Sequence, residues 1–188
     1  ARLPLPVLDG IEELKGPILL NLWSKTCLSC MEELSEWSAQ QGRLKSSGLR
    51  VLILNADGDP EAGRSYPFES AAVFPSTVRR LDLFQRAILD RWNPLPVPSS
   101  FLIDRGGRVA VIYKGRVDVG QLLEDYKLLD AEPQVWRRSA LSFPGRFISS
   151  LPKPQPLNVS SQLVDAAQPR VALRYLEDFA AVNPVDGD

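Results

Sequence analysis

The chain contains two cysteines, Cys27 and Cys30, in the segment LLNLWSKTCLSCMEELSEW (19–37). Residues separated by three positions are neighbours on a helix, so this pair suits either a structural disulfide or reversible redox chemistry. Histidine is absent, which excludes a Cys-His hydrolase dyad and any metal site that contains histidine. Because two cysteines alone do not complete a four-ligand zinc site, we expect no metal and no bound cofactor.

The position of the pair predicts which thiol reacts first. An apolar run ends at Trp23, and a helix is expected to begin near Cys27. Unpaired backbone N–H groups and the positive end of the helix dipole favour a thiolate at this place. Cys27 should be exposed and Cys30 should face the sheet. We therefore assign Cys27 as the nucleophile and Cys30 as the resolving thiol.

The surrounding elements predict an α/β domain. Residues 17–23 and 49–57 are short and apolar, as is typical of strands buried on both faces, and the helix between them is expected to end at Gly48. Strand, helix and strand form a parallel crossover unit. A C-x-x-C pair at the start of the helix in such a unit predicts a thioredoxin-like redox motif rather than a permanently closed structural bridge.

The rest of the chain is less regular. Residues 58–98 are interpreted as an insertion or cap with one amphipathic helix over about 76–92. Residues 100–113 predict a hairpin around a Gly-Gly turn, and a closing helix is expected over 119–130. Residues 159–182 predict one or two helices, which either begin a helical-repeat region or dock on the core.

Charge and composition exclude some classes of partner. The 22 basic and 23 acidic residues give a net charge of −1, too balanced for the electrostatic attraction that nucleic-acid binding needs. No segment approaches the ~18 apolar residues of a membrane span, and the first ten residues lack the features of a secretory signal. We expect membrane attachment only through a tether outside this chain, if at all.

These motifs resemble the thioredoxin superfamily and, within it, the TlpA-like membrane-tethered or periplasmic thiol-disulfide oxidoreductases. PILLNLWSKTCLSC is similar to the family's strand and active-site motif, and VPSSFLIDRGGRVAVIYKG to its Pro-led hairpin. The likeness covers about residues 3–130. It implies an α/β, thioredoxin-like three-layer fold, a central mixed β-sheet flanked by helices. To this we add the central helical insertion (58–98) and a C-terminal extension, so residues 1–130 form the domain and 131–188 a Pro-rich strap or linker and a helical tail.

The resemblance also implies roles for individual residues. Val97-Pro98 corresponds to the family's cis-proline bond, which presents backbone to an extended partner segment. Trp23 is a further candidate for the partner groove, although a Trp at a strand end is more often a core residue. Asn21 takes the place of a buried carboxylate in thioredoxin itself, so another proton acceptor is needed. Asp57 and water are the candidates, although an Asp after a strand is more often a turn residue or a helix cap.

The expected function is thiol-disulfide exchange with a protein partner, by analogy as a reductase, in the periplasm or another extracytoplasmic compartment. The sequence departs from the family pattern at Thr26, where Trp is usual, and at Leu28-Ser29, where the dipeptide usually contains Pro. These departures and the tail favour an alternative, a redox-inert interaction module of a larger protein. A peroxide-reducing redoxin is a third interpretation, which no surrounding motif supports.

Overall fold

The structure is a computed structural model, which describes residues 2–9, 11, 14, 16–89, 93–132, 135 and 155–183. Within these residues, six strands form one sheet in the order β1-β6-β5-β2-β3-β4. The strands are β1 (Leu3–Pro4), β2 (Ile18–Trp23), β3 (Arg50–Asn55), β4 (Glu69–Ala72), β5 (Ser99–Ile103) and β6 (Arg108–Lys114). Strands β2, β3 and β4 are parallel, whereas β5 runs antiparallel to β2 and β6, and β1 antiparallel to β6. The expected mixed sheet is therefore confirmed.

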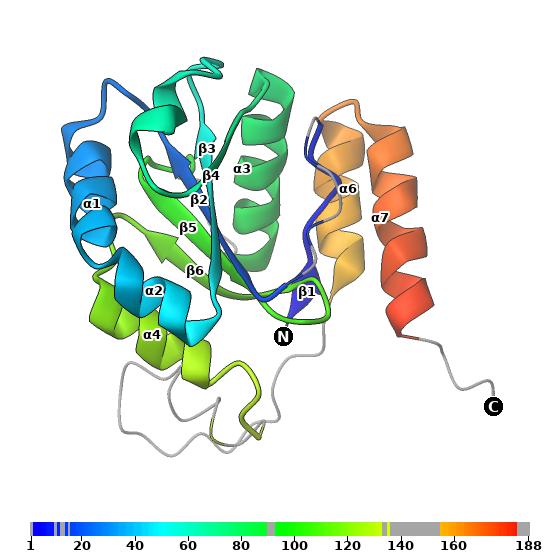
Figure 1. The fold of residues 1–188 in the computed structure, drawn as a ribbon. Helices are drawn as coiled ribbons and strands as arrows, with labels where there is room; N and C mark the ends of the chain where they lie inside the picture. The colour runs from blue at the N-terminus through cyan, green and yellow to red at the C-terminus, as the bar shows by residue number, and fades with distance from the viewer. Residues whose placement is uncertain are drawn as a thin grey trace.

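Helices cover both faces of the sheet (Figure 1). They are α1 (Leu28–Ala39), α2 (Gln41–Ser47), α3 (Pro75–Leu89), α4 (Val119–Lys127), α6 (Pro156–Asp165) and α7 (Pro169–Val182), with a 3-10 turn η1 (Ala62–Ser65). One face carries α1, α2 and α4, and the other carries α3, with α6 and α7 beyond it. This is the three-layer arrangement that the sequence predicted. None of the helices in the described part of the chain combines the length and apolar composition of a bilayer-spanning helix.

Strand β2 shows why the core divides into two clusters. All six of its residues are buried, and successive side chains of a strand point to opposite faces. Leu19 and Trp23 pack with α1, α2 and α4 in one cluster. Ile18, Leu20 and Leu22 pack with α3 in the other cluster. The unbroken apolar run is therefore required, because both faces of this central strand are covered.

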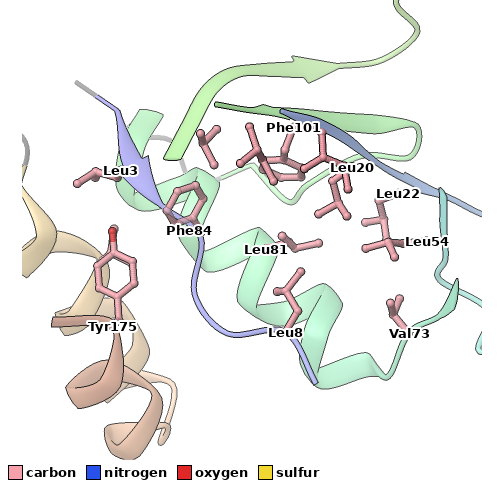
Figure 2. Close-up of a cluster of buried hydrophobic side chains, with 14 of the residues drawn as sticks. Leu3, Leu8, Leu20, Leu22, Leu54, Val73, Leu81, Phe84, Phe101 and Tyr175 are labelled. Atoms are coloured by element: carbon pink, nitrogen blue, oxygen red, sulfur yellow. The ribbon is translucent and has the colours of Figure 1, made fainter. Parts of the chain in front are cut away.

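The cluster on the α3 face extends to the C-terminal helices (Figure 2). Residues Val159 and Leu163 of α6 and Tyr175 of α7 are at most 1% exposed and lie in the same cluster as Phe84. The guanidinium group of Arg80 also links α3 to the loop between α6 and α7 and to the N-terminal segment. It donates hydrogen bonds to Gln168 Oε1 at 2.7 Å, to the Val7 carbonyl oxygen at 2.9 Å and to Asp9 Oδ1 at 2.8 Å. The division of the chain at residue 131 stays a prediction.

Some elements differ from those expected. The helix that follows the cysteines is two helices, interrupted at Gln40, and Gly48 ends the second with a left-handed φ of 79°, as predicted. Residues 58–98 contain η1 and β4 in addition to α3. Strand β4 was not predicted, because four residues of sequence ESAA, partly exposed, carry no apolar pattern. Almost all of the Pro-rich strap, and the C-terminal end of the helix predicted over 76–92, lie outside the described residues.

Candidate active site

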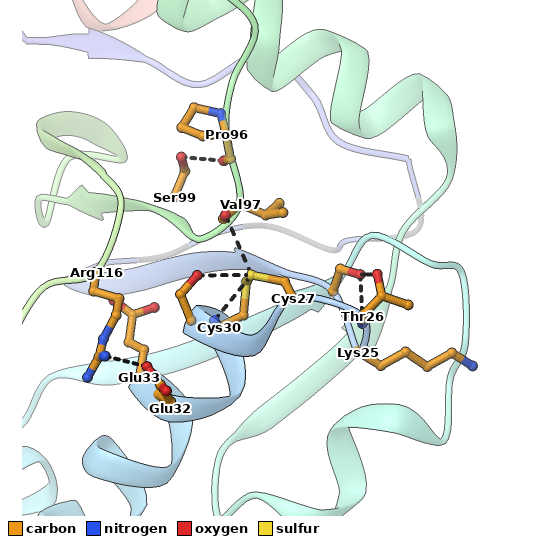
Figure 3. Close-up of a disulfide and its surroundings, with 12 residues drawn as sticks. Lys25, Thr26, Cys27, Cys30, Glu32, Glu33, Pro96, Val97, Ser99 and Arg116 are labelled. Carbon is orange, nitrogen blue, oxygen red and sulfur yellow. Dashed lines mark hydrogen bonds and ion pairs between the residues drawn. A yellow bond between two sulfur atoms is a disulfide. The ribbon is translucent and has the colours of Figure 1, made fainter.

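Cys27 and Cys30 form a disulfide at the N-terminus of α1 (Figure 3). Their Cα atoms are 5.3 Å apart. Cys27 is the N-cap residue of the helix and is partly exposed, whereas Cys30 is fully buried in the cluster beneath α1. Cys27 is thus the more exposed of the two cysteines, as expected.

Two hydrogen-bond donors surround the Cys27 sulfur. The backbone N–H of Cys30 donates to Sγ at 3.2 Å, and Oγ of Ser29 lies 3.3 Å from the same atom. A serine hydroxyl rotates freely, so it can donate its proton when the sulfur becomes negatively charged. Together with the dipole of α1, these donors favour a thiolate at Cys27 in the reduced protein.

The loop before β5 lies against the same sulfur. The carbonyl oxygen of Val97 is 3.6 Å from Cys27 Sγ, and the Val97–Pro98 peptide bond is cis, as the resemblance implied. The side chain of Val97 is 37% exposed and that of Leu28 is 68% exposed. Two apolar side chains therefore lie on the surface next to Cys27, together with the backbone of Val97.

A buried carboxyl group lies beneath α1. Glu33 is 1% exposed. Its Oε2 accepts a hydrogen bond from Asn21 Nδ2 at 3.0 Å, and its Oε1 accepts one from the backbone N–H of Val117 at 2.7 Å. Burial raises the pKa of Glu33 from 4.5 to about 7, because it disfavours the charged form by more than these hydrogen bonds favour it. This group therefore titrates near neutral pH.

Asp57 has a different environment at the exposed end of β3. Its carboxylate accepts hydrogen bonds from Ser24 Oγ at 2.8 Å, from the Lys25 backbone N–H at 2.7 Å and from Asn55 Nδ2 at 3.2 Å. Desolvation alone would raise the pKa of Asp57, but the hydrogen bonds from Lys25, Ser24 and Asn55 together outweigh it and hold the pKa below its ordinary value. Such a carboxylate is a weak base. Its role as a proton acceptor stays a prediction that this environment does not favour.

The comparisons agree with this arrangement. No family model matches the chain. Thiol-disulfide oxidoreductase ResA of Bacillus subtilis (strain 168) is 27% identical over 117 residues, which cover 62% of this chain and 63% of that protein. ResA of Bacillus thuringiensis subsp. konkukian (strain 97-27) is 27% identical over 118 residues, or 62% of this chain and 66% of that protein. The chain thus matches slightly less than two thirds of the length of each relative.

A solved structure shows the fold. The thiol:disulfide interchange protein, thioredoxin family protein of Chlorobium tepidum TLS superposes with a TM-score of 0.54 at 16% identity, over 69% of this chain and 97% of that chain. The chain therefore has a thioredoxin-like fold. In sequence it is similar to the ResA thiol-disulfide oxidoreductases.

One predicted contact residue, Trp23, lies in the core. Trp23 is only 2% exposed, and its ring packs edge-on against that of Tyr66, with centroids 5.5 Å apart. It lies in the same buried cluster as Cys30. With so little exposed surface Trp23 packs as a core residue, and its place in the partner groove stays a prediction that this burial does not favour. Its position at the end of a central, doubly covered strand explains the burial.

Glu33 is not among the predicted site residues. It stands in the Glu-rich segment that follows the cysteines. The available signal was its spacing, because Cys30, Glu33, Leu34 and Trp37 follow the i, i+3, i+4, i+7 pattern of one buried helix face. A carboxyl group in such a stripe requires a buried partner. Asn21 of β2 is that partner, so α1 brings a carboxyl group to a strand position that carries an amide.

The loop between β6 and α4 joins these parts of the site. Its Gly115 N–H donates to the carbonyl oxygen of Pro98 at 2.9 Å, and its Val117 N–H donates to Glu33. Between them, the Arg116 guanidinium group pairs with two carboxylates of α1, Glu32 at 2.6 Å (Figure 3) and Glu36 at 3.3 Å. Among the described residues, no group of three or more Cys, Asp or Glu side chains is arranged to hold a metal ion.

Proposed function

We propose that this chain is a thiol-disulfide oxidoreductase that exchanges disulfides with a protein partner and works as a reductase. One observation carries the proposal: the partly exposed Cys27 lies at the N-terminus of α1, with two hydrogen-bond donors beside its sulfur and the buried Cys30 bonded to it. The similarity to proteins named thiol-disulfide oxidoreductase supports the same reaction.

The proposed reaction has two steps. The Cys27 thiolate attacks one sulfur of the partner's disulfide, which breaks and releases one partner sulfur as a thiolate that takes up a proton. The Cys30 thiolate then attacks Cys27 Sγ in the mixed disulfide, and the second partner sulfur leaves as a thiolate and is protonated. The chain loses two electrons and two protons as its dithiol becomes a disulfide. The partner's disulfide gains these two electrons and two protons and becomes two thiols.

Glu33 is suited to the second step. Cys30 is buried when it must lose its proton, and Glu33 lies one turn further along the same helix face. A carboxyl group with a pKa of about 7 can accept a proton at neutral pH and return it to solvent. We assign Glu33, rather than Asp57, as the proton acceptor for Cys30. Asn21 holds the Glu33 carboxyl group in place.

The partner segment is proposed to bind beside Val97. The backbone of an extended segment would pair with the Val97 backbone, while apolar side chains of the segment contact Val97 and Leu28. The compartment is proposed to be extracytoplasmic, as in TlpA-like proteins, since disulfides that need exchange persist where the environment is oxidising.

The proposal is tested by redox equilibrium and turnover together. The protein is equilibrated in dithiol buffers of graded potential, alkylated, and its oxidised fraction is measured by mass. Turnover of a disulfide-containing peptide is followed with dithiothreitol as the electron donor. We expect one two-electron transition and turnover above the uncatalysed rate, with Cys27→Ser as the inactive control. A pair that exchanges with no buffer and a rate equal to the background would favour the redox-inert interaction module instead.

A further inference from the structure

The turn that precedes Cys27 is held by the carboxylate of Asp57. Residues 24–26 connect β2 to α1 and cross the end of β3, where Asp57 lies. Each oxygen of the carboxylate contacts this turn: Oδ1 accepts from Ser24 Oγ at 2.8 Å, and Oδ2 accepts from the Lys25 N–H at 2.7 Å. Two consecutive residues of the turn, Ser24 and Lys25, are therefore attached to the segment that follows β3.

Further hydrogen bonds link Ser24 to Thr26 and to the reactive Cys27. Ser24 Oγ accepts a hydrogen bond from the Thr26 N–H at 3.2 Å and shares another with the Thr26 hydroxyl at 2.9 Å. The carbonyl oxygen of Ser24 accepts the N–H of Cys27 at 3.2 Å. The backbone amides of Lys25, Thr26 and Cys27 are thus all bound to Asp57 or to Ser24. Release of the carboxylate would therefore loosen the turn on the N-terminal side of Cys27, while the Cys27 carbonyl oxygen would still accept the Cys30 and Met31 N–H groups.

Asp57 is itself held in place by β3. The side-chain oxygen of Asn55 accepts the backbone N–H groups of Asp57 at 3.1 Å and of Asp59 at 3.0 Å, and the Asn55 amide donates to Asp57 Oδ2 at 3.2 Å. The neighbouring carboxylate of Asp59 has a separate partner, the Lys25 ammonium group at 3.1 Å. Lys25 therefore neutralises Asp59 at the surface, and no hydrogen bond joins its ammonium group to Cys27.

We propose that Asp57 is a positioning residue for Cys27: by binding Ser24 and the Lys25 amide it keeps the sulfur at the helix N-terminus, within reach of the Cys30 and Ser29 donors. This inference rests on the proposed function in that Cys27 is taken as the nucleophile. In this role the Asp57 carboxylate accepts hydrogen bonds from the turn and does not accept a proton from a cysteine. The two roles differ in what an amide at position 57 can do.

An asparagine at position 57 keeps most of the geometry but cannot accept a proton. Its one carbonyl oxygen can accept the Lys25 N–H, and its amide group can donate to Ser24 Oγ, which is able to act as either donor or acceptor. An alanine removes every contact. A positioning role therefore predicts that Asp57→Asn retains function and Asp57→Ala loses it. A proton acceptor predicts that both variants lose function equally. A purely electrostatic effect predicts faster thiolate formation in both, because a nearby negative charge disfavours a thiolate.

The test measures the reactivity of Cys27 without any partner. The reduced protein is treated with iodoacetamide at pH 7, and the rate constant for alkylation of Cys27 is followed by peptide mass spectrometry. We expect Asp57→Ala to react about tenfold more slowly, since a hydrogen bond to a charged group is worth about 1.5 kcal/mol. Asp57→Asn should react within about threefold of the unmodified protein. Asp59→Ala is the matched control and should react at the unmodified rate.

A second variant removes the hydroxyl group of Ser24, the hydrogen-bond partner of Asp57. Ser24→Ala removes the hydroxyl that joins Asp57 to Thr26, so it should slow alkylation in the same direction as Asp57→Ala. The inference would be overturned if Asp57→Ala were alkylated at the unmodified rate. It would also be overturned if Asp57→Ala and Asp57→Asn were slowed equally, or if both were alkylated faster. Because alkylation needs no partner, absence of peptide turnover would refute the proposed function while leaving this result interpretable.

Discussion

Glu33 accepts a hydrogen bond from Asn21 at 3.0 Å in the core between α1 and the sheet. The helix therefore brings a carboxyl group to a strand position that carries an amide. Neither residue is accessible to solvent, with exposures of 1% and 0%. A titratable group in this place has consequences for both the reaction and the stability of the fold.

The first consequence concerns the rate. Replacement of Glu33 by glutamine removes the proposed proton acceptor of Cys30 and should lower peptide-disulfide turnover at pH 8 by about 100-fold. The unmodified protein should gain activity as pH rises through about 7, where Glu33 loses its proton, and the variant should lack this rise. Initial rates between pH 5.5 and 9 measure both effects. The exposed neighbour Glu32 provides the control, since Glu32→Gln should keep the rise, and a Glu33→Gln variant with an unchanged profile would exclude the assignment.

The second consequence concerns stability. Burial raises the pKa of Glu33 from 4.5 to about 7, so the folded chain binds this proton more tightly than the unfolded chain. The resulting stabilisation is complete below pH 4.5 and is lost as pH rises to about 7, a difference of about 3 kcal/mol. Glu33→Gln should therefore gain stability relative to the unmodified protein between pH 5 and pH 8. Urea denaturation of the oxidised proteins at both pH values measures the change, and parallel pH dependence in the two proteins would contradict it.

The sequence determines the central strands and the cysteine site because their signals are local. Two apolar runs, a Gly-Gly turn and the N-terminal position of the cysteines predict β2, β3, the β5–β6 hairpin and the start of α1. The Asn21–Glu33 pair is different. The two residues are 12 positions apart and meet only after α1 packs on the sheet, so no window of sequence shows the contact.

Two further features depend on tertiary structure in the same way. Strand β4 has no strand pattern of its own. It forms because residues Leu52 to Asn55 of β3 present an open edge, with which the short segment pairs. Trp23 lies at the end of a doubly covered strand, and its cover includes the ring of Tyr66, from the loop before β4. In both cases the deciding neighbour comes from a distant part of the chain.

Ser29 offers a direct test of the environment of Cys27. Loss of its hydroxyl in Ser29→Ala removes one donor from the sulfur and should destabilise the thiolate by about 1 kcal/mol. The reduced form should be less stable, and the reduction potential about 20 mV more negative. Equilibration with glutathione buffers measures the potential. Ser29→Thr keeps a hydroxyl and should stay close to the unmodified value, whereas equal potentials in all three proteins would show that the hydroxyl does not act on the sulfur.

Tyr175 tests whether α7 belongs to the same folding unit as the sheet. Its ring is 1% exposed, and its hydroxyl has no hydrogen-bond partner among the described residues. Tyr175→Phe should therefore be neutral or slightly stabilising, whereas Tyr175→Ala should lower the free energy of unfolding by about 3 to 5 kcal/mol. Thermal and urea denaturation, followed by circular dichroism, distinguish the two. An alanine variant as stable as the phenylalanine variant would show that α7 does not contribute to the core.

The central claim is that Cys27 attacks and Cys30 resolves. The most direct measurement mixes reduced Cys30→Ser and reduced Cys27→Ser, separately, with a disulfide-containing peptide and determines intact masses over time. The account predicts that Cys30→Ser rapidly accumulates a mixed disulfide with the peptide and that Cys27→Ser, whose remaining thiol is buried, forms almost none. A stable mixed disulfide on Cys30 in the Cys27→Ser variant, with none on Cys27 in the other, would contradict it.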